Sequence, residues 1–245
     1  KCYFSFCFTM HQKNSFYFAL QSTFIMSNED QLQQIKEIRS IMERSSRFIS
    51  LSGLSGVFAG FFALSCAAAF YAYINTRLNY GYSDLVRATA NDLDAFPTLV
   101  AFCVADGAIV ITLSLLFAIF FTTRKARNVG QKIWDSSAQR MVINLFIPLI
   151  AGGLYCLILL QQHRFGLIAP TTLIFYGLGL LNASKYTLDE IRWLGISEII
   201  LGLVGCYFIG YGVTLWSIGF GVLHIIYGLV MYVRYESKPQ EKKFW

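Results

Sequence analysis

Six apolar stretches of about twenty residues each divide this chain, and only short polar segments separate them. A bilayer core of about 30 Å needs roughly 20 apolar residues as a helix, because lipid offers the backbone no hydrogen-bond partner. The sequence therefore predicts an all-α fold, a polytopic bundle of six transmembrane helices. The expected spans are residues 48–74, 98–122, 141–160, 166–183, 196–212 and 215–233, with a tight turn near residues 211–214 between the last two.

The composition excludes an ordinary soluble domain. Hydrophobic residues make up 56% of the chain and charged residues 14%, whereas soluble domains carry about 25% charged residues. The net charge of +6 needs no nucleic-acid partner, because basic residues flanking membrane spans and facing anionic lipid explain it. The expected partners are membrane lipids and a second copy of the chain or another membrane protein.

The distribution of Lys and Arg predicts the orientation. From Met26 onward, fifteen of them lie before the first span, in the segments after the second and fourth spans, and after the last span, all on one side of the expected membrane. The other side carries only Arg77, Arg87 and Arg164. Because basic residues are retained on the cytoplasmic side, both termini are expected in the cytoplasm and the protein in a bacterial inner membrane.

The first 47 residues contain two different segments. Residues 1–25 are rich in Phe and Tyr, but polar residues 11–14 interrupt the apolar run that a signal peptide would need. We expect translation to start at Met26, with a genuine interfacial N-terminal segment as the alternative. Over residues 26–47, apolar residues recur every three or four positions and predict an amphipathic cytoplasmic helix. That helix could cover the bundle, lie on lipid or bind a partner. Residues 236–245 would form a cytoplasmic tail.

Small residues repeat along one face of the first span. Ser52, Gly56 and Gly60 are spaced four residues apart. Small side chains let helix backbones approach closely in lipid, where no hydrophobic effect drives helices together. These residues predict a helix-packing face, within one protomer or between two. Before the fifth span, Thr187 and Glu190 have the spacing of a capping box and predict a helix starting there.

Polar groups inside the spans are the candidate functional residues. His224 lies ten residues before Arg234, near the expected midplane, and Glu198 lies six residues after Arg192, one to two turns inside the membrane boundary. Charged groups at such depths are costly and usually mark function or a fixed polar contact. Both could pair, with Asn144 and Asn182 as nearby candidates.

Two interpretations of this intramembrane site stay open: a relay for protons or cations, or a neutral histidine hydrogen-bonded to a neighbouring helix. A further acidic residue, Asp106, is expected close to the outer surface, where its charge costs little.

The sequence does not favour an enzyme. Cys66, Cys103, Cys156 and Cys206 occur singly in four different expected spans, and small apolar cysteines are common in buried helices. No nucleophile, phosphate-binding, dinucleotide-binding or zinc-protease motif is present. No cofactor, metal site or catalytic residue is therefore expected.

Several stretches resemble a known family, namely residues 34–60, 130–153, 166–202 and 220–228. The whole segment from Met26 to Glu236 is similar to an uncharacterised six-span membrane protein family of the Bacteroidetes. The resemblance implies the same six-span fold and transfers no active-site residues. Members often carry the name beta-carotene 15,15'-monooxygenase. Carotenoid oxygenases bind iron through four histidines, and this chain has three, which argues against that activity.

Two functions follow from the sequence as hypotheses. The first is a non-catalytic membrane scaffold or regulator, in which the amphipathic N-terminal helix and the glycine faces contact partners. The alternative is a transporter for a small solute or ion, with a polar site near Glu198 and His224.

Overall fold

The computed structural model describes residues 32–35, 38, 52–93, 96–129 and 134–237. The chain divides into two units, residues 1–46 and 47–245. In the first unit, the described residues are helical, and the side chains of Leu32, Ile35 and Ile38 are exposed. The predictions for residues 1–25, for most of 26–47 and for 238–245 concern residues outside this description.

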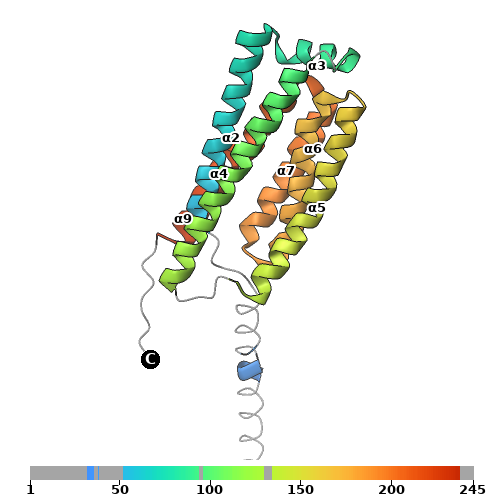
Figure 1. Ribbon diagram of the computed structural model, residues 1–245. Helices are drawn as coiled ribbons and strands as arrows, with labels where there is room; N and C mark the ends of the chain where they lie inside the picture. The colour runs from blue at the N-terminus through green and yellow to red at the C-terminus, as the bar shows by residue number, and fades with distance from the viewer. Residues whose placement is uncertain (1–31, 36–37, 39–51, 94–95, 130–133, 238–245) are drawn as a thin grey trace, which may run out of the picture. The chain divides into compact units, whose positions relative to one another are not determined.

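The second unit is helical, with no strand among its described residues (Figure 1). Its long helices are α2 (Gly53–Tyr73), α4 (Pro97–Val129), α5 (Ser136–Gln161), α6 (Ile168–Ala183), α7 (Asp189–Tyr207) and α9 (His224–Tyr235). Its shorter α-helices are α3 (Tyr82–Asn91) and α8 (Gly212–Trp216). Single turns of 3₁₀-helix are η2 (Phe165–Leu167), η3 (Ser184–Tyr186) and η4 (Ile209–Tyr211), and π-helices are η1 (Ile74–Leu78) and η5 (Ser217–Leu223). The predicted all-α class is confirmed.

Five of the helical segments are long and apolar enough to cross a membrane. They are Gly53–Leu78, Pro97–Asn128, Ser136–Gln161, Phe165–Tyr186 and Ile209–Tyr235. The α7 helix is not among these five, because its 19 residues include Asp189, Glu190, Arg192 and Glu198. The turn that joins α7 to the last apolar segment lies near Phe208, a few residues before the expected position, because η4 and α8 already belong to that segment.

The helices form two groups of three (Figure 1). In the first group, α2 packs along both α4 and α9; in the second, α6 packs along both α5 and α7. The last two elements of the final apolar segment, η5 and α9, contact α2 and also contact α7. They therefore belong to the first group and form part of the boundary with the second.

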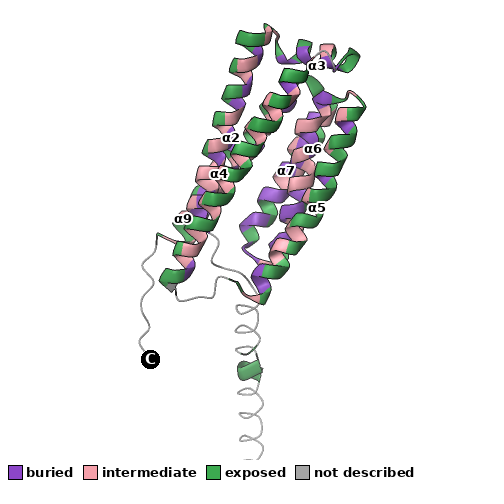
Figure 2. Ribbon diagram, viewed as in Figure 1, coloured by how far each residue is buried: buried purple, intermediate pink, exposed green. Residues whose placement is uncertain are grey.

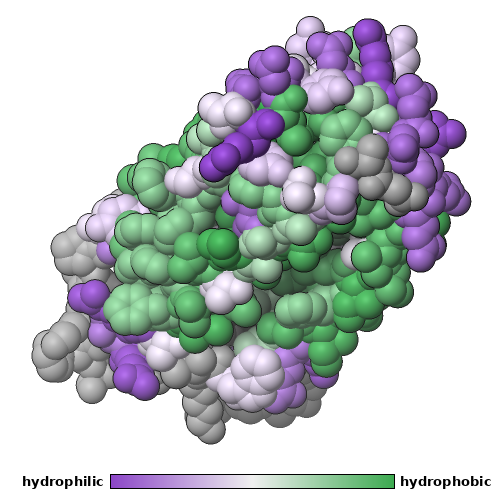
Figure 3. Space-filling view, turned by 45° about the horizontal axis from the view of Figure 1, so that its top comes forward, coloured by the Kyte–Doolittle hydropathy of each residue, from purple (hydrophilic) through white to green (hydrophobic). Residues whose placement is uncertain are grey.

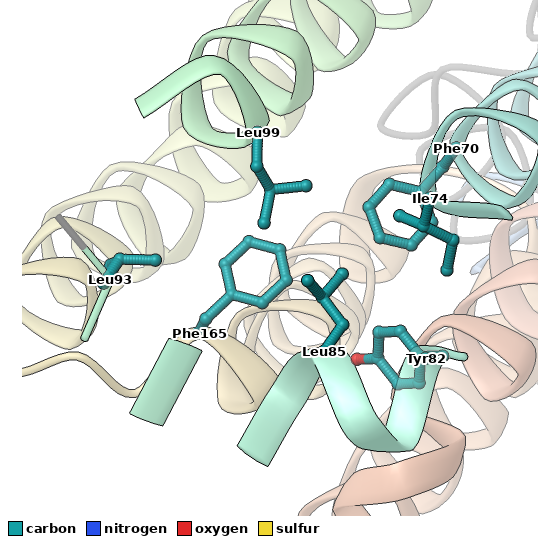
Figure 4. Packing of buried hydrophobic residues seen from close by; sticks show 7 residues of the cluster. All are labelled: Phe70, Ile74, Tyr82, Leu85, Leu93, Leu99 and Phe165. Carbon is teal, nitrogen blue, oxygen red and sulfur yellow. The ribbon is translucent and has the colours of Figure 1, made fainter. Parts of the chain in front are cut away.

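One apolar cluster closes the end of the bundle where α3 lies. Phe70, Ile74, Tyr82, Leu85, Leu99 and Phe165 come from α2, η1, α3, α4 and η2, and Figure 4 shows their side chains converging. Burial raises the pKa of the Tyr82 phenol, the largest effect on that group. A second cluster, which includes Leu180, Leu194 and Met231, joins α6, α7 and α9 nearer the opposite end. The two clusters hold both helix groups together.

The outer faces of the bundle are apolar. Figure 2 shows exposed residues along α4 and α5 and buried residues concentrated on α6 and α7. On α4, the exposed side chains include Ile111, Leu115, Leu116, Ile119 and Phe120. In the face shown in Figure 3, hydrophobic residues dominate the middle and hydrophilic residues lie mainly toward the ends. This distribution suits a surrounding of hydrocarbon with water at either end.

Candidate functional site: a buried carboxyl beside a histidine

The most unusual side chain in the described bundle is Glu198. It lies nine residues from either end of α7, about 14 Å along the helix axis from each. Its exposed fraction is 0%, and both carboxyl oxygens lack a hydrogen-bond partner. Glu198 therefore lies at the middle of α7, and six residues separate it from Arg192. A buried polar atom without a partner costs about 1–3 kcal/mol, and more if it is charged.

His224 faces Glu198 across the boundary between the two helix groups. The Nδ1 atom of His224 lies 3.4 Å from Oε1 of Glu198 and 3.0 Å from the carbonyl oxygen of Gly219. Because a carbonyl oxygen can only accept a hydrogen bond, Nδ1 carries a proton and donates it to Gly219. The imidazole is 6% exposed. The Nδ1–H group of His224 therefore bonds to Gly219, and the Glu198 carboxylate beside it receives no hydrogen bond.

Tyr176 of α6 completes the group, which we call the polar triad: Tyr176, Glu198 and His224. Its hydroxyl lies 2.9 Å from Nε2 of His224. When the imidazole is neutral, Nε2 accepts a hydrogen bond from Tyr176; when it is protonated, Nε2 donates one to the same oxygen. The ring of Phe220 stacks on the imidazole at 5.7 Å between centroids. The contacts of His224 therefore suit both of its protonation states.

The π-helix η5 positions these groups. Its seven residues, Ser217–Leu223, directly precede His224 and contain Gly219 and Gly221. A side-chain atom added at Gly219 would collide with Oε2 of Glu198 and lie 2.5 Å from Cδ2 of Leu173. The absence of a side chain at residue 219 thus creates the space that the carboxyl group fills. Short π-helical segments are frequent at functional sites.

The two asparagines predicted near this site lie elsewhere. The Asn144 side-chain amide donates a hydrogen bond to the carbonyl oxygen of Arg140 in its own helix, at 2.8 Å. Asn182 follows Tyr176 by six residues on α6 and is half-buried, about 9 Å farther along the axis. Neither asparagine is a partner of Glu198, whose oxygens have none. The structure brings Glu198 and His224 together and places Tyr176 where the asparagines were expected.

The small residues of α2 pack against the last apolar segment. A Cβ atom at Gly56 would lie 3.3 Å from the Cα of Gly228, and one at Gly60 would lie 2.6 Å from the carbonyl oxygen of Gly221. Gly53 contacts the backbone of Gly228 in the same way. We call this contact the glycine seam: Gly53, Gly56 and Gly60 of α2 against Gly221 and Gly228. It lies within one protomer, on the α2 side of the last helix.

Ser52 is not a packing residue of the glycine seam but part of a polar contact at its end. The Ser52 hydroxyl donates to Oε2 of Glu236 at 3.3 Å, and the backbone N–H of Gly53 donates to Oε1 at 2.6 Å. Lys125 of α4 pairs with the same carboxylate at 3.3 Å. A carboxylate at a helix N-terminus compensates the unpaired N–H groups there. Glu236 thereby ties the end of α9 to the start of α2.

Glu190 forms a second contact at the same end. Its Oε1 accepts hydrogen bonds from Arg234 at 2.8 Å and from the Tyr235 hydroxyl at 3.0 Å. The residue before α7 is Leu188, whose side chain forms no capping hydrogen bond, and the capping box of Thr187 and Glu190 stays a prediction. Glu190 joins α7 to the end of α9.

Asp106 lies on α4, and its position close to the outer surface stays a prediction. It is nine residues after Pro97, where α4 begins, about 14 Å along the axis. The thiol of Cys66 on α2 donates to its Oδ2 at 2.8 Å. Within the described part of the chain, no three His, Cys, Asp or Glu side chains are grouped so that they could hold a metal ion.

Comparison of the chain with protein-family models, with curated proteins and with solved structures returns no match. The resemblance to a six-span family of the Bacteroidetes is not tested by these comparisons and stays a prediction.

Proposed function

We propose that this chain is a six-span transporter of a small solute or ion, with the polar triad at its centre. The observation that carries the proposal is the fully buried carboxyl of Glu198, which faces His224 and has no hydrogen-bond partner. A charged group this deep in a membrane costs at least about 2.5–3.5 kcal/mol, and such groups characteristically line ion or proton pathways.

The sixth span of this proposal is α7. Near its start, Asp189 and Arg192 are exposed and Glu190 is paired with Arg234, and Glu198 is covered by other helices. Glycines at residues 195 and 202 hold it against α6, the former touching the backbone of Gly177. With six spans, the fifteen-to-three division of basic residues puts both termini in the cytoplasm of a bacterial inner membrane.

The arrangement of the helices supports transport over a purely structural role. Tyr176 and Glu198 belong to the α5–α6–α7 group, and His224 belongs to the segment that packs on α2. The polar triad thus lies at the boundary between two helix groups. Rocking of one helix bundle against another around a fixed site is a common way for transporters to expose a site to each side of a membrane.

The experiment is proton movement in vesicles. Purified protein is reconstituted into liposomes that contain a pH-sensitive dye, and a potassium diffusion potential is imposed with valinomycin. We expect the dye to report faster acidification of the vesicle interior than in empty vesicles. We expect the Glu198→Gln variant to abolish this difference. The matched control is Ser197→Ala, a neighbouring residue whose hydroxyl bonds only within its own helix, to Trp193. Equal rates for wild type and Glu198→Gln would contradict the proposal.

A membrane scaffold or regulator is the second candidate, and the exposure of α4 favours it. Only 6% of the residues in the most apolar 18-residue stretch of α4 are buried in the protein. This leaves an apolar surface free for lipid or a partner helix. A scaffold predicts that deletion of Gln31–Arg44 abolishes a complex recovered from native membranes, whereas His224→Ala leaves that complex intact. The opposite pattern would favour the transporter.

A further inference from the structure

The polar triad can hold a definite number of protons, and its geometry limits that number. The titratable side chains that face the Glu198 carboxyl are His224 at 3.4 Å and Tyr176, which lies near it on α6. In this arrangement Nδ1 of His224 carries a proton, because it lies 3.0 Å from the carbonyl oxygen of Gly219, which can only accept a hydrogen bond. The variable positions are therefore the Glu198 carboxyl and Nε2 of His224.

Consider the triad with neither position protonated. Glu198 is then a carboxylate with no donor, and the site has a net charge of −1 in a fully buried location. Such an uncompensated charge costs several kcal/mol. Adding one proton removes the net charge. The proton lies either on Glu198, giving two neutral groups, or on Nε2 of His224, giving an ion pair across the boundary.

The contacts of His224 accommodate both forms that contain this proton. With the proton on Glu198, Nε2 accepts a hydrogen bond from the Tyr176 hydroxyl; with the proton on Nε2, it donates one to the same oxygen. The stacked ring of Phe220 also tolerates a positive imidazolium. A second proton would give a net charge of +1 and restore the penalty. While the triad is buried as in this structure, the state with one proton therefore has the lowest free energy.

We propose that Glu198, His224 and Tyr176 form a binding site for a single exchangeable proton, which is released only when α7 and the last helix separate enough to admit water. This inference rests on the proposed transport function and names its coupling ion. The site takes H⁺ from water and returns it to water, and only an O–H or N–H bond forms or breaks. Gly219 is a positioning residue, because its lack of a side chain holds the carboxyl in place.

The experiment locates the proton spectroscopically in the full-length protein in lipid. Infrared spectra report the C=O stretch of a protonated carboxyl group, and ¹⁵N spectra of labelled histidine report an imidazolium. Near neutral pH we expect the two signals from the triad to account together for one proton per protein. Glu198→Gln identifies the carboxyl signal and His224→Gln the imidazolium. Asp106→Asn, which removes another intramembrane carboxyl group, is the control and leaves both signals unchanged.

The Tyr176→Phe variant tests the triad as a unit. Removal of the hydroxyl takes away the acceptor that stabilises the imidazolium, so the fraction of the proton on Glu198 should rise. A purely structural role for Tyr176 would leave that fraction unchanged. A carboxylate and a neutral imidazole present together near neutral pH, or a carboxyl signal that persists in Glu198→Gln, would overturn the proton site.

The proton site and the transport function can fail separately. If the signal of one proton depends on Glu198 but the vesicles show no proton movement that depends on Glu198, the site stands and the transport function is wrong. If vesicles transport protons while the triad carries none, the transport function stands and this inference is wrong.

Discussion

The two sides of η5 and α9, Ser217–Tyr235, are built in opposite ways. On one side, the glycine seam brings its backbone against the backbone of α2, with Gly53 and Gly228 in direct contact. On the other side, Glu198 and Tyr176 meet His224 through polar atoms, and the carboxyl of Glu198 has no hydrogen-bond partner. On the α2 side, the backbones are in direct contact, so the helices cannot shift there without a clash. On the side of Glu198 and Tyr176, the charge can change, and we expect motion of the protein to occur there.

The largest expected effect comes from filling the glycine seam. A side chain at Gly228 would start 2.7 Å from the Gly53 carbonyl oxygen and 2.7 Å from the Val57 backbone nitrogen. Neither backbone can move without shifting α2, so Gly228→Leu should cost more than about 3 kcal/mol, the upper part of the overpacking range. Thermal unfolding in detergent micelles measures the loss. Gly153→Leu is the control, because nothing lies within 4 Å of that position. Equal melting temperatures for the two variants would mean that the seam is not closely packed.

A smaller loss of stability is expected on the polar side. In His224→Ala, Glu198 loses the imidazole that lies 3.4 Å from it and Tyr176 loses the acceptor for its hydroxyl. We expect a destabilisation of about 1–3 kcal/mol, limited because Glu198 can bind a proton instead. Unfolding in micelles again gives the value, with the conservative His224→Gln as the comparison. If His224→Ala were more stable than the wild type, the contact between Glu198 and His224 would be destabilising.

Gly219→Ala should separate stability from function. The added methyl group meets the ends of two flexible side chains, Glu198 and Leu173, and not a backbone. These side chains can move, so we expect a loss of only about 1 kcal/mol, at the low end of overpacking costs. Because the carboxyl must leave its position, proton movement in vesicles should nevertheless fall at least tenfold. Unchanged proton movement would show that the exact position of Glu198 does not matter.

The smallest effect is expected at the end of the bundle. Glu236→Gln keeps an oxygen acceptor for Gly53 but removes the charge that faces the start of α2 and Lys125. Charges at helix termini contribute about 0.3–1 kcal/mol. Melting temperatures should fall by a few degrees at most. A loss as large as that of Gly228→Leu would show that this contact, and not the glycine seam, holds α9 against α2.

The general architecture followed from the sequence, because lipid imposes helices of a fixed length on any apolar segment. The spacing of small residues every four positions predicted a helix-packing face, and Gly56 and Gly60 do pack closely against the last helix. Glu198 and His224 could be paired because few ionisable groups lie in adjacent spans. Boundaries were less accurate: η4 and α8 extend the last apolar segment toward residue 209, and no composition signal distinguishes a turn at 208 from one at 212.

Tyr176 and Gly219 could not be found from the sequence. The chain contains 14 tyrosines and 19 glycines, and nothing in their local spacing marks the two that contact the polar triad. Asn144 was predicted near the site, but its side-chain amide donates to the carbonyl oxygen of Arg140 in its own helix. These properties depend on how α6, α7 and the π-helix pack, which only the three-dimensional arrangement specifies.

The most direct test of the interaction across the polar side is a double-mutant cycle with Glu198→Gln, His224→Leu and the double variant, measured by unfolding in mixed micelles. If the two side chains stabilise each other, the single losses will not add. We expect a coupling free energy of at least about 1 kcal/mol, since residues in contact typically couple by 0.5–3 kcal/mol. Additivity within about 0.3–0.5 kcal/mol, as for distant sites, would contradict a direct interaction between Glu198 and His224.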